Sequence, residues 1–164
     1  MNIIDTTART WRRGKKTKGL MAKPIINLLV DKKVVNKFLI DTLEGREPLG
    51  DGTIFCIGEG GDAWQQSSKA LLKKYEVKSI DADGWMICEP RPENEVEFFE
   101  VTPEMTMAGE NAIIGLWGET IGDVEKCQRL VAGDFVCRQP HDTSDQWVVR
   151  RTLFLNTYSE LGAK

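Results

Sequence analysis

The sequence predicts a β-rich α+β fold made of small antiparallel sheets, and three observations lead to this prediction. Three apolar stretches with a cysteine near their end recur along the chain: TIFCI at 53–57, WMICE at 85–89 and DFVCR at 134–138. A polar turn and a second apolar stretch follow each one, which is the pattern of a β-hairpin. A helix-start signal follows each hairpin. We therefore predict a strand–turn–strand–short-helix unit that is used three times.

The first and third copies match each other best. In the first, the turn GEGGD at 58–62 leads to AWQQS at 63–67, and Ser67 offers a helix cap. In the third, the turn at 139–145 leads to QWVVR at 146–150, and Thr152 offers the cap. A tryptophan on the second strand and a tyrosine after the helix are eleven residues apart in both copies. We predict one packing arrangement that occurs twice, in units too short to bury their own faces.

The middle copy is the most divergent. Its turn, PRPEN at 90–94, leads to EVEFFEV at 95–101, and Thr102-Pro103-Glu104 offers a cap, a first-turn proline and an early acid. Phenylalanine and methionine replace the tryptophan and the tyrosine of the other copies. We still predict a hairpin and a short helix here.

The third copy, GDFVCRQPHDTSDQWVVRRTLFLNTYSEL at 133–161, resembles a small domain of phage and bacterial proteins that is named for its PGDYG sequence. The first copy matches this pattern less well, and the similarity covers about half of the chain. It implies a phage-like origin and no catalytic mechanism. The residues that carry the resemblance are Gly133, Asp134, Phe135, Val136, Trp147, Thr157 and Tyr158.

The length and composition are those of a globular protein. The chain has 164 residues, of which 41% are hydrophobic and 29% are charged. No apolar run approaches the roughly 20 residues of a membrane-spanning helix, and no secretory signal is recognisable, so we expect a cytoplasmic protein. We expect an N-terminal arm at 1–23 and a compact region at 24–164, with a possible division into 24–80 and 81–164.

The arm at 1–23 is strongly basic, with seven Lys or Arg residues against one acid, whereas the rest of the chain sums to about −9. Lysine and arginine bind phosphate backbones, and an aromatic ring stacks on bases. Nucleic acid is therefore the favoured partner. The alternatives are an acidic protein surface, including the chain's own body, or a passive tail before a second start at Met21. The predicted contact residues are Arg9, Trp11, Arg12, Arg13, Lys15, Lys16 and Lys18.

Catalytic and metal-binding signals are weak. The four cysteines have no CxxC spacing and are expected to be buried apolar side chains. His141 lies in a turn with Asp142 and Ser144, which cannot form a triad because a base and its nucleophile need separate elements. The glycines at 58–62 are explained by a wide hairpin turn. We expect no cofactor and no metal.

Three segments complete the prediction. Residues 31–45 fit a helix slightly better than a strand, 111–121 fit a strand with a turn, and 123–132 fit either element. The favoured function is a non-enzymatic accessory protein that binds DNA through its arm. The second hypothesis is a modulator of a host protein that acts through the acidic body, and the third is an enzyme on a nucleotide-like substrate.

Overall fold

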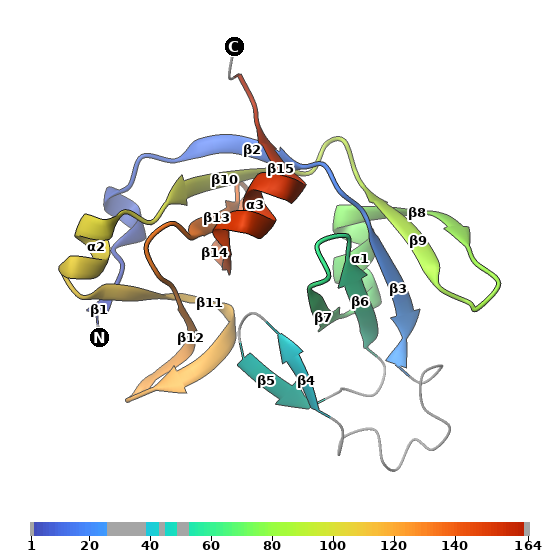
Figure 1. Cartoon of the computed structure of the whole chain (residues 1–164), viewed down its shortest axis with the longest axis horizontal. Helices are drawn as coiled ribbons and strands as arrows, with labels where there is room; N and C mark the ends of the chain where they lie inside the picture. Colours follow the sequence, from blue (N-terminus) through green and yellow to red (C-terminus); the bar gives the residue numbers. More distant parts are fainter. Residues whose placement is uncertain (1, 26–38, 43–44, 49–52, 163–164) are drawn as a thin grey trace. The chain divides into compact units, whose positions relative to one another are not determined.

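The computed structural model describes residues 2–25, 39–42, 45–48 and 53–162 (Figure 1). They belong to two compact units, which we describe separately. Unit 1 combines Met1–Lys16 with Glu95–Lys164, and unit 2 is the continuous stretch Thr17–Asn94. Each unit contains one five-stranded antiparallel sheet. The predicted β-rich architecture of small antiparallel sheets is confirmed, but the predicted boundary after residue 80 falls inside unit 2.

Unit 2 has the strand order β7-β6-β3-β9-β8, with the helix α1 between β7 and β8 in the chain. One face of its sheet, which we call the inner face, packs with Leu71 of α1 and carries Leu20, Cys56 and Cys88. A small hairpin, β4-β5, forms a separate two-stranded sheet. The bounds are β3 Leu20–Pro24, β4 Leu39–Thr42, β5 Gly45–Pro48, β6 Ile54–Gly58, β7 Ala63–Gln66, α1 Ser68–Lys74, β8 Tyr75–Ile80 and β9 Met86–Pro90.

Unit 1 has the strand order β14-β13-β10-β2-β15, and a second sheet of order β1-β11-β12. The first residues of the chain therefore take part in both sheets of this unit. The bounds are β1 Asn2–Ile3, η1 Thr6–Ala8, β2 Arg12–Lys16, β10 Glu95–Glu100, α2 Pro103–Met107, β11 Glu110–Ile121, β12 Val124–Arg129, β13 Phe135–Gln139, β14 Asp142–Val149, α3 Arg151–Thr157 and β15 Tyr158–Glu160.

The five-stranded sheet of unit 1 is covered on both faces because residues alternate along a strand. On its inner face Phe98 and Cys137 pack with Phe154 of α3. On its outer face Phe99 and Val136 pack in a second core that also includes residues of the β1-β11-β12 sheet. Neighbouring residues of β10 and β13 thus belong to different cores.

Two helix starts lie where the capping signals predict them. The Ser67 hydroxyl accepts a hydrogen bond from the Ala70 amide at 3.1 Å, and the Thr102 hydroxyl accepts one from the Met105 amide at 3.4 Å. The cap of the third helix is Arg150, two residues before the predicted Thr152, and it makes no side-chain capping hydrogen bond.

The first and third predicted hairpins are present as β6-β7 and β13-β14, and their cysteines face the predicted tryptophans. Cys56 lies opposite Trp64, and Cys137 lies opposite Trp147. The middle hairpin is a wrong prediction. β9 pairs with β3 and β8, whereas β10 pairs with β2 and β13. Cys88 of β9 is buried in the core of unit 2 and Phe98 of β10 in the core of unit 1, so these consecutive strands serve different sheets.

The predicted N-terminal arm is also wrong as an appendage. β2 lies between β10 and β15 in unit 1, and β3 lies between β6 and β9 in unit 2 (Figure 1). Gly14, Leu20 and Ala22 are buried. The basic composition of this segment concealed its strand character, because the few residues that reach an interior, these three among them, are small or apolar.

The remaining segment predictions have mixed outcomes. Most of the helix considered for 31–45 lies outside the described residues, and its described part, Leu39–Thr42, is a strand. The predicted strand at 111–121 is confirmed within β11, and the ambiguous stretch that follows contains β12. The four cysteines are buried free thiols, as predicted.

Candidate nucleic-acid interface around strand β2

The predicted contact residues occupy a strand and the segments that flank it. Arg9 and Trp11 precede β2, and Lys18 follows it. The β2 side chains alternate between the two faces of the unit 1 sheet, because successive residues of a strand point to opposite sides. Arg12 and Lys16 lie on the inner face, which carries Phe98, and Arg13 and Lys15 lie on the outer face. The structure therefore divides the predicted basic cluster.

The inner-face cations contact aromatic rings. The Arg12 guanidinium lies 4.7 Å from the centre of the Phe98 ring and donates a hydrogen bond to Glu160 at 3.2 Å. The Lys16 ammonium lies 5.8 Å from the centre of the Tyr158 ring. Cation–π contacts of this kind hold the cations at the sheet rather than in free solution.

The outer-face cations contact acids of neighbouring strands. Arg13 forms an ion pair with Glu95, and Glu97 accepts a hydrogen bond from Arg138 at 2.6 Å. Arg138 also lies 3.9 Å from the centre of the Trp11 ring. The Arg13–Glu95 pair joins the basic segment to an acid of the chain's own body, which is the kind of contact that one weighed alternative expects.

Trp11 is half-buried and is held on several sides. Its ring makes an edge contact with Phe99 at 4.8 Å, and its indole N–H donates to the Thr6 carbonyl at 3.1 Å. With Arg138 over its face, the ring is not an open platform for stacking a base. Among the predicted contact residues, the tryptophan is the one whose predicted role fits this geometry least.

The charge asymmetry of the sequence disappears when the chain is divided into units. Unit 1 contains eleven basic and thirteen acidic residues, and unit 2 contains eleven and twelve. Because β2 is incorporated beside the acidic strand β10, neither unit has an excess of positive charge. The composition of neither unit therefore supplies the strongly basic surface that is typical of proteins that bind phosphate backbones.

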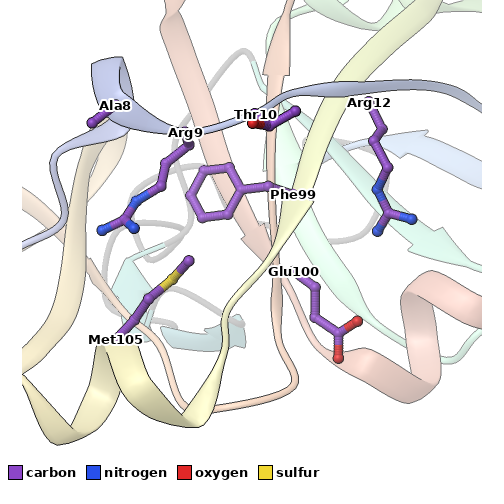
Figure 2. A pocket seen from close by; sticks show the side chains of 7 residues that line it. All are labelled: Ala8, Arg9, Thr10, Arg12, Phe99, Glu100 and Met105. Atoms are coloured by element: carbon purple, nitrogen blue, oxygen red, sulfur yellow. The ribbon is translucent and has the colours of Figure 1, made fainter.

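An open cavity of about 460 Å³ lies beside the start of β2 (Figure 2). In Figure 2 the guanidinium groups of Arg9 and Arg12 lie on either side of the Phe99 ring. Met105 adds an apolar wall, and Glu100 adds a carboxylate that pairs with Arg151. The lining residues are Ala8, Arg9, Thr10, Arg12, Phe99, Glu100 and Met105.

One donor of Arg9 has no partner among the described residues. Its terminal nitrogen forms an ion pair with Glu110, which leaves the rest of the guanidinium at the cavity. Its Nε is buried and has no hydrogen-bond partner among the described residues. A buried donor without an acceptor is costly, so an anionic group in the cavity that reached this Nε would relieve that cost.

Sequence reasoning found the two arginines of this cavity but missed its other residues. Phe99, Glu100 and Met105 belong to β10 and α2, about ninety positions later in the chain. The cap at Thr102 indicates that a helix begins there, but no local signal indicates that β10 pairs with β2. The cavity results from that long-range pairing.

The other candidate sites lack an arrangement suited to catalysis or metal binding among the described residues. His141 lies exposed in the β13-β14 turn, and the glycines at 58–62 form the β6-β7 turn, closed by a 2.9 Å hydrogen bond from the Gly58 amide to the Asp62 carbonyl. Complete burial raises the pKa of the Cys137 thiol, and burial also raises that of Cys88. Neither thiol is activated as a nucleophile. Within the described ranges, no cluster of three or more His, Cys, Asp or Glu residues is arranged to hold a metal ion.

Comparisons with known proteins identify no relative. No family model matches the chain, and no curated protein or solved structure is significantly similar to it. None of the described helices has the length and apolar character needed to cross a bilayer. A functional assignment therefore depends on the geometry of the sites.

Proposed function

We propose that the protein binds nucleic acid, and that the cavity beside β2 receives a phosphate together with part of the adjoining nucleotide. The observation that supports this proposal is the placement of two arginines around an apolar wall. Arg9 offers an Nε without a partner beside the Phe99 ring, and Arg12, whose guanidinium lies over Phe98 on the other face of the sheet, adds a second cation at the edge of the cavity. A single strand suits this site better than a duplex, because an unpaired nucleotide exposes its base to apolar contact.

The other cations of the segment would make weaker phosphate contacts. The outer-face residue Arg13 is paired with Glu95, and exchange of that partner for a phosphate gains little. We therefore expect few net phosphate contacts and a moderate salt dependence. For two contacts to a single strand, the slope of log K against log salt is roughly −1.4.

The test is the affinity of a fluorescently labelled single-stranded oligonucleotide, measured by anisotropy at two salt concentrations. We expect Arg9→Gln and Arg12→Gln each to weaken binding about tenfold, since each removes a charge-assisted hydrogen bond. The matched control is Arg129→Gln, which removes an exposed arginine of the same unit that pairs with Glu119 away from the cavity. Equal affinities for all four proteins, or no binding at all, would refute the proposal. A truncation that starts at Met21 is unsuitable because it removes β2 from its sheet.

A second candidate function, binding to a host protein, is favoured by the outer face of unit 2. Ile87, Met21 and Ile57 lie side by side on three neighbouring strands, and the Met21 side chain is 39% exposed. Glu76 and Glu89 oppose each other on the same sheet. An apolar band beside acids fits a basic and apolar protein surface.

The test of this second function is chemical cross-linking of the purified protein in a bacterial extract. We expect Met21→Glu to abolish a specific cross-linked product that Leu72→Glu retains, because Leu72 is exposed on α1 instead. Identical products from both variants would argue against the apolar band. The PGDYG-like residues support a phage-like origin and action in the cytoplasm of a bacterial host as the setting for either function.

A further inference from the structure

The five-stranded sheets of the two units correspond strand by strand and residue by residue. Both place a cysteine opposite a tryptophan, Cys56 with Trp64 and Cys137 with Trp147. On the other side, Cys56 faces Ala22 of β3 and Cys137 faces Phe98 of β10. A seven-residue helix follows the hairpin in each unit, and a tyrosine begins the next strand.

One strand of each sheet departs from the order in which the chain supplies the others. It is the strand that pairs with the strand after the helix. In unit 2 this position is held by β9, between β3 and β8. In unit 1 it is held by β2, between β10 and β15. Yet β2 directly precedes β3 in the chain, and β9 directly precedes β10. β2 and β9 occupy equivalent places, and each lies in a different sheet from the strand that follows it in the chain.

We propose that the chain consists of two matched modules, β2–β8 and β9–β15, that have exchanged their first strands, and that the slot between β10 and β15 is a binding surface that selects a small, cationic strand. The partner that fits this slot is β2. The proposal is independent of the function proposed above, since it concerns which strand binds and not what the cavity receives.

Each exchanged strand could instead pair with the strand that follows it in the chain, so some feature of the strands must favour the observed pairing. The segment between β2 and β3 has three residues, 17–19, and the segment between β9 and β10 has four, 91–94. In the register of the two sheets, closed hairpins would pair residue 14 with 20 and residue 88 with 96. The pairs that follow, 15 with 19 and 90 with 94, would leave three-residue loops at 16–18 and 91–93, which are ordinary for β-hairpins. A closed arrangement, with β2 paired to β3 and β9 paired to β10, would keep the same strand order in both sheets.

Side-chain size favours the exchanged arrangement. A Cβ added to Gly14 would lie 2.8 Å from the Phe98 ring and 2.8 Å from the Ser159 carbonyl oxygen. The equivalent residue of β9 is Cys88, which is fully buried opposite Leu20 in unit 2. In the slot of unit 1 its side chain would collide with both groups, whereas Gly14 in unit 2 would leave its volume empty.

Charge favours the same arrangement. Arg13 and Lys15 of β2 lie opposite Glu97 and Glu95 of β10. The equivalent residues of β9 are Ile87 and Glu89. In the slot of unit 1, Glu89 would oppose Glu95, and like charges directly opposite each other destabilise a strand pair. In unit 2, Ile87 instead lies opposite Met21.

The test exchanges the two five-residue strands in the full chain, through R12M, R13I, G14C, K15E and K16P together with M86R, I87R, C88G, E89K and P90K. The readout is the set of cross-strand nuclear Overhauser effects. In the natural chain they should join residue 96 to 14 and residue 20 to 88. In the exchanged variant we expect the contacts of residue 96 with 88 and of residue 20 with 14 to be about ten times as intense as the natural ones. The reason is that the residues responsible for the size and charge matches have moved with the strands.

Retention of the natural contacts in the exchanged variant, or its failure to fold, would overturn the proposal, since either shows that the strands are not interchangeable. A second measurement tests whether charge favours the pairing of β2 with β10 in the chain with its natural strand order. We expect Glu95→Lys to speed amide exchange in residues 12–16 about tenfold, and Lys15→Glu added to it to restore protection. Amide exchange that Glu95→Lys leaves unchanged would exclude selection by charge.

Discussion

The outer faces of the two five-stranded sheets differ at equivalent positions, whereas the inner faces share a cysteine–tryptophan pair. The row that crosses four strands of unit 1 is polar and charged: Arg13, Glu97, Arg138 and Gln146. The same row in unit 2 is apolar: Ile87, Met21, Ile57 and Ala63. On the inner faces both units keep the cysteine–tryptophan pair. The cysteine–tryptophan pair is thus common to both sheets, whereas the chemistry of the outer row differs between them.

The largest expected effect comes from the inner face of unit 1. Phe98→Ala removes a buried ring that contacts Phe135 and Phe154, and we expect a loss of about 3–5 kcal/mol in the free energy of unfolding. Phe55→Ala, on the half-buried outer face of unit 2, should cost clearly less. Urea unfolding curves measure both. Equal losses would mean that inner and outer faces contribute alike.

The next largest loss of stability is expected at the helix caps, which occupy equivalent positions in the two units. Ser67 caps α1 through its hydroxyl, whereas Arg150 at the cap of α3 forms an ion pair with the buried Asp134. We expect Arg150→Ala to cost about 2 kcal/mol, because it leaves a buried carboxylate with one partner fewer. Ser67→Ala should cost about 1 kcal/mol. Thermal unfolding of both variants checks this order, which a larger loss for Ser67→Ala would reverse.

A smaller effect is expected from the charged outer row. Arg138→Ala removes the Glu97 pair and the contact with the Trp11 ring, so we expect a loss of about 1 kcal/mol that shrinks at high salt. Ile57→Ala, at the equivalent position of unit 2, should show no salt dependence. Unfolding curves at low and high salt distinguish the two variants. A loss of unfolding free energy for Arg138→Ala that did not change with salt would contradict the ion-pair interpretation.

The smallest effect at neutral pH concerns two inner-face thiols, Cys137 of unit 1 and Cys88 of unit 2. Burial raises the pKa of Cys137 and of Cys88 above their unfolded values. The stabilisation is therefore complete below an unfolded pKa of about 8.5 and falls as the pH rises above it. Unfolding between pH 7 and pH 10 measures this fall, and Cys137→Ala should reduce its slope. A stability that rises over this range would contradict it.

The sequence allowed prediction of local features but not of the sheet partners. Two hairpins, the caps at Ser67 and Thr102 and the burial of the cysteines follow from adjacent residues. The positions of β2 and β9 do not, because each pairs with a strand that the chain reaches much earlier or later. The cations of β2 and the acids of β10 are complementary in the sequence, yet complementarity alone does not identify register. The size match of Gly14 with Phe98 is visible only once the strands are paired.

The placement of β2 has a consequence for synthesis on the ribosome. Residues 12–16 need β10 and β15 as neighbours, and β15 ends at Glu160. Unit 2 is complete once residue 94 has emerged, but β2 must wait until residue 160 has emerged. During that interval the cationic residues 12–16 have no sheet partner, which leaves them open to capture by chaperones or anionic RNA before folding ends.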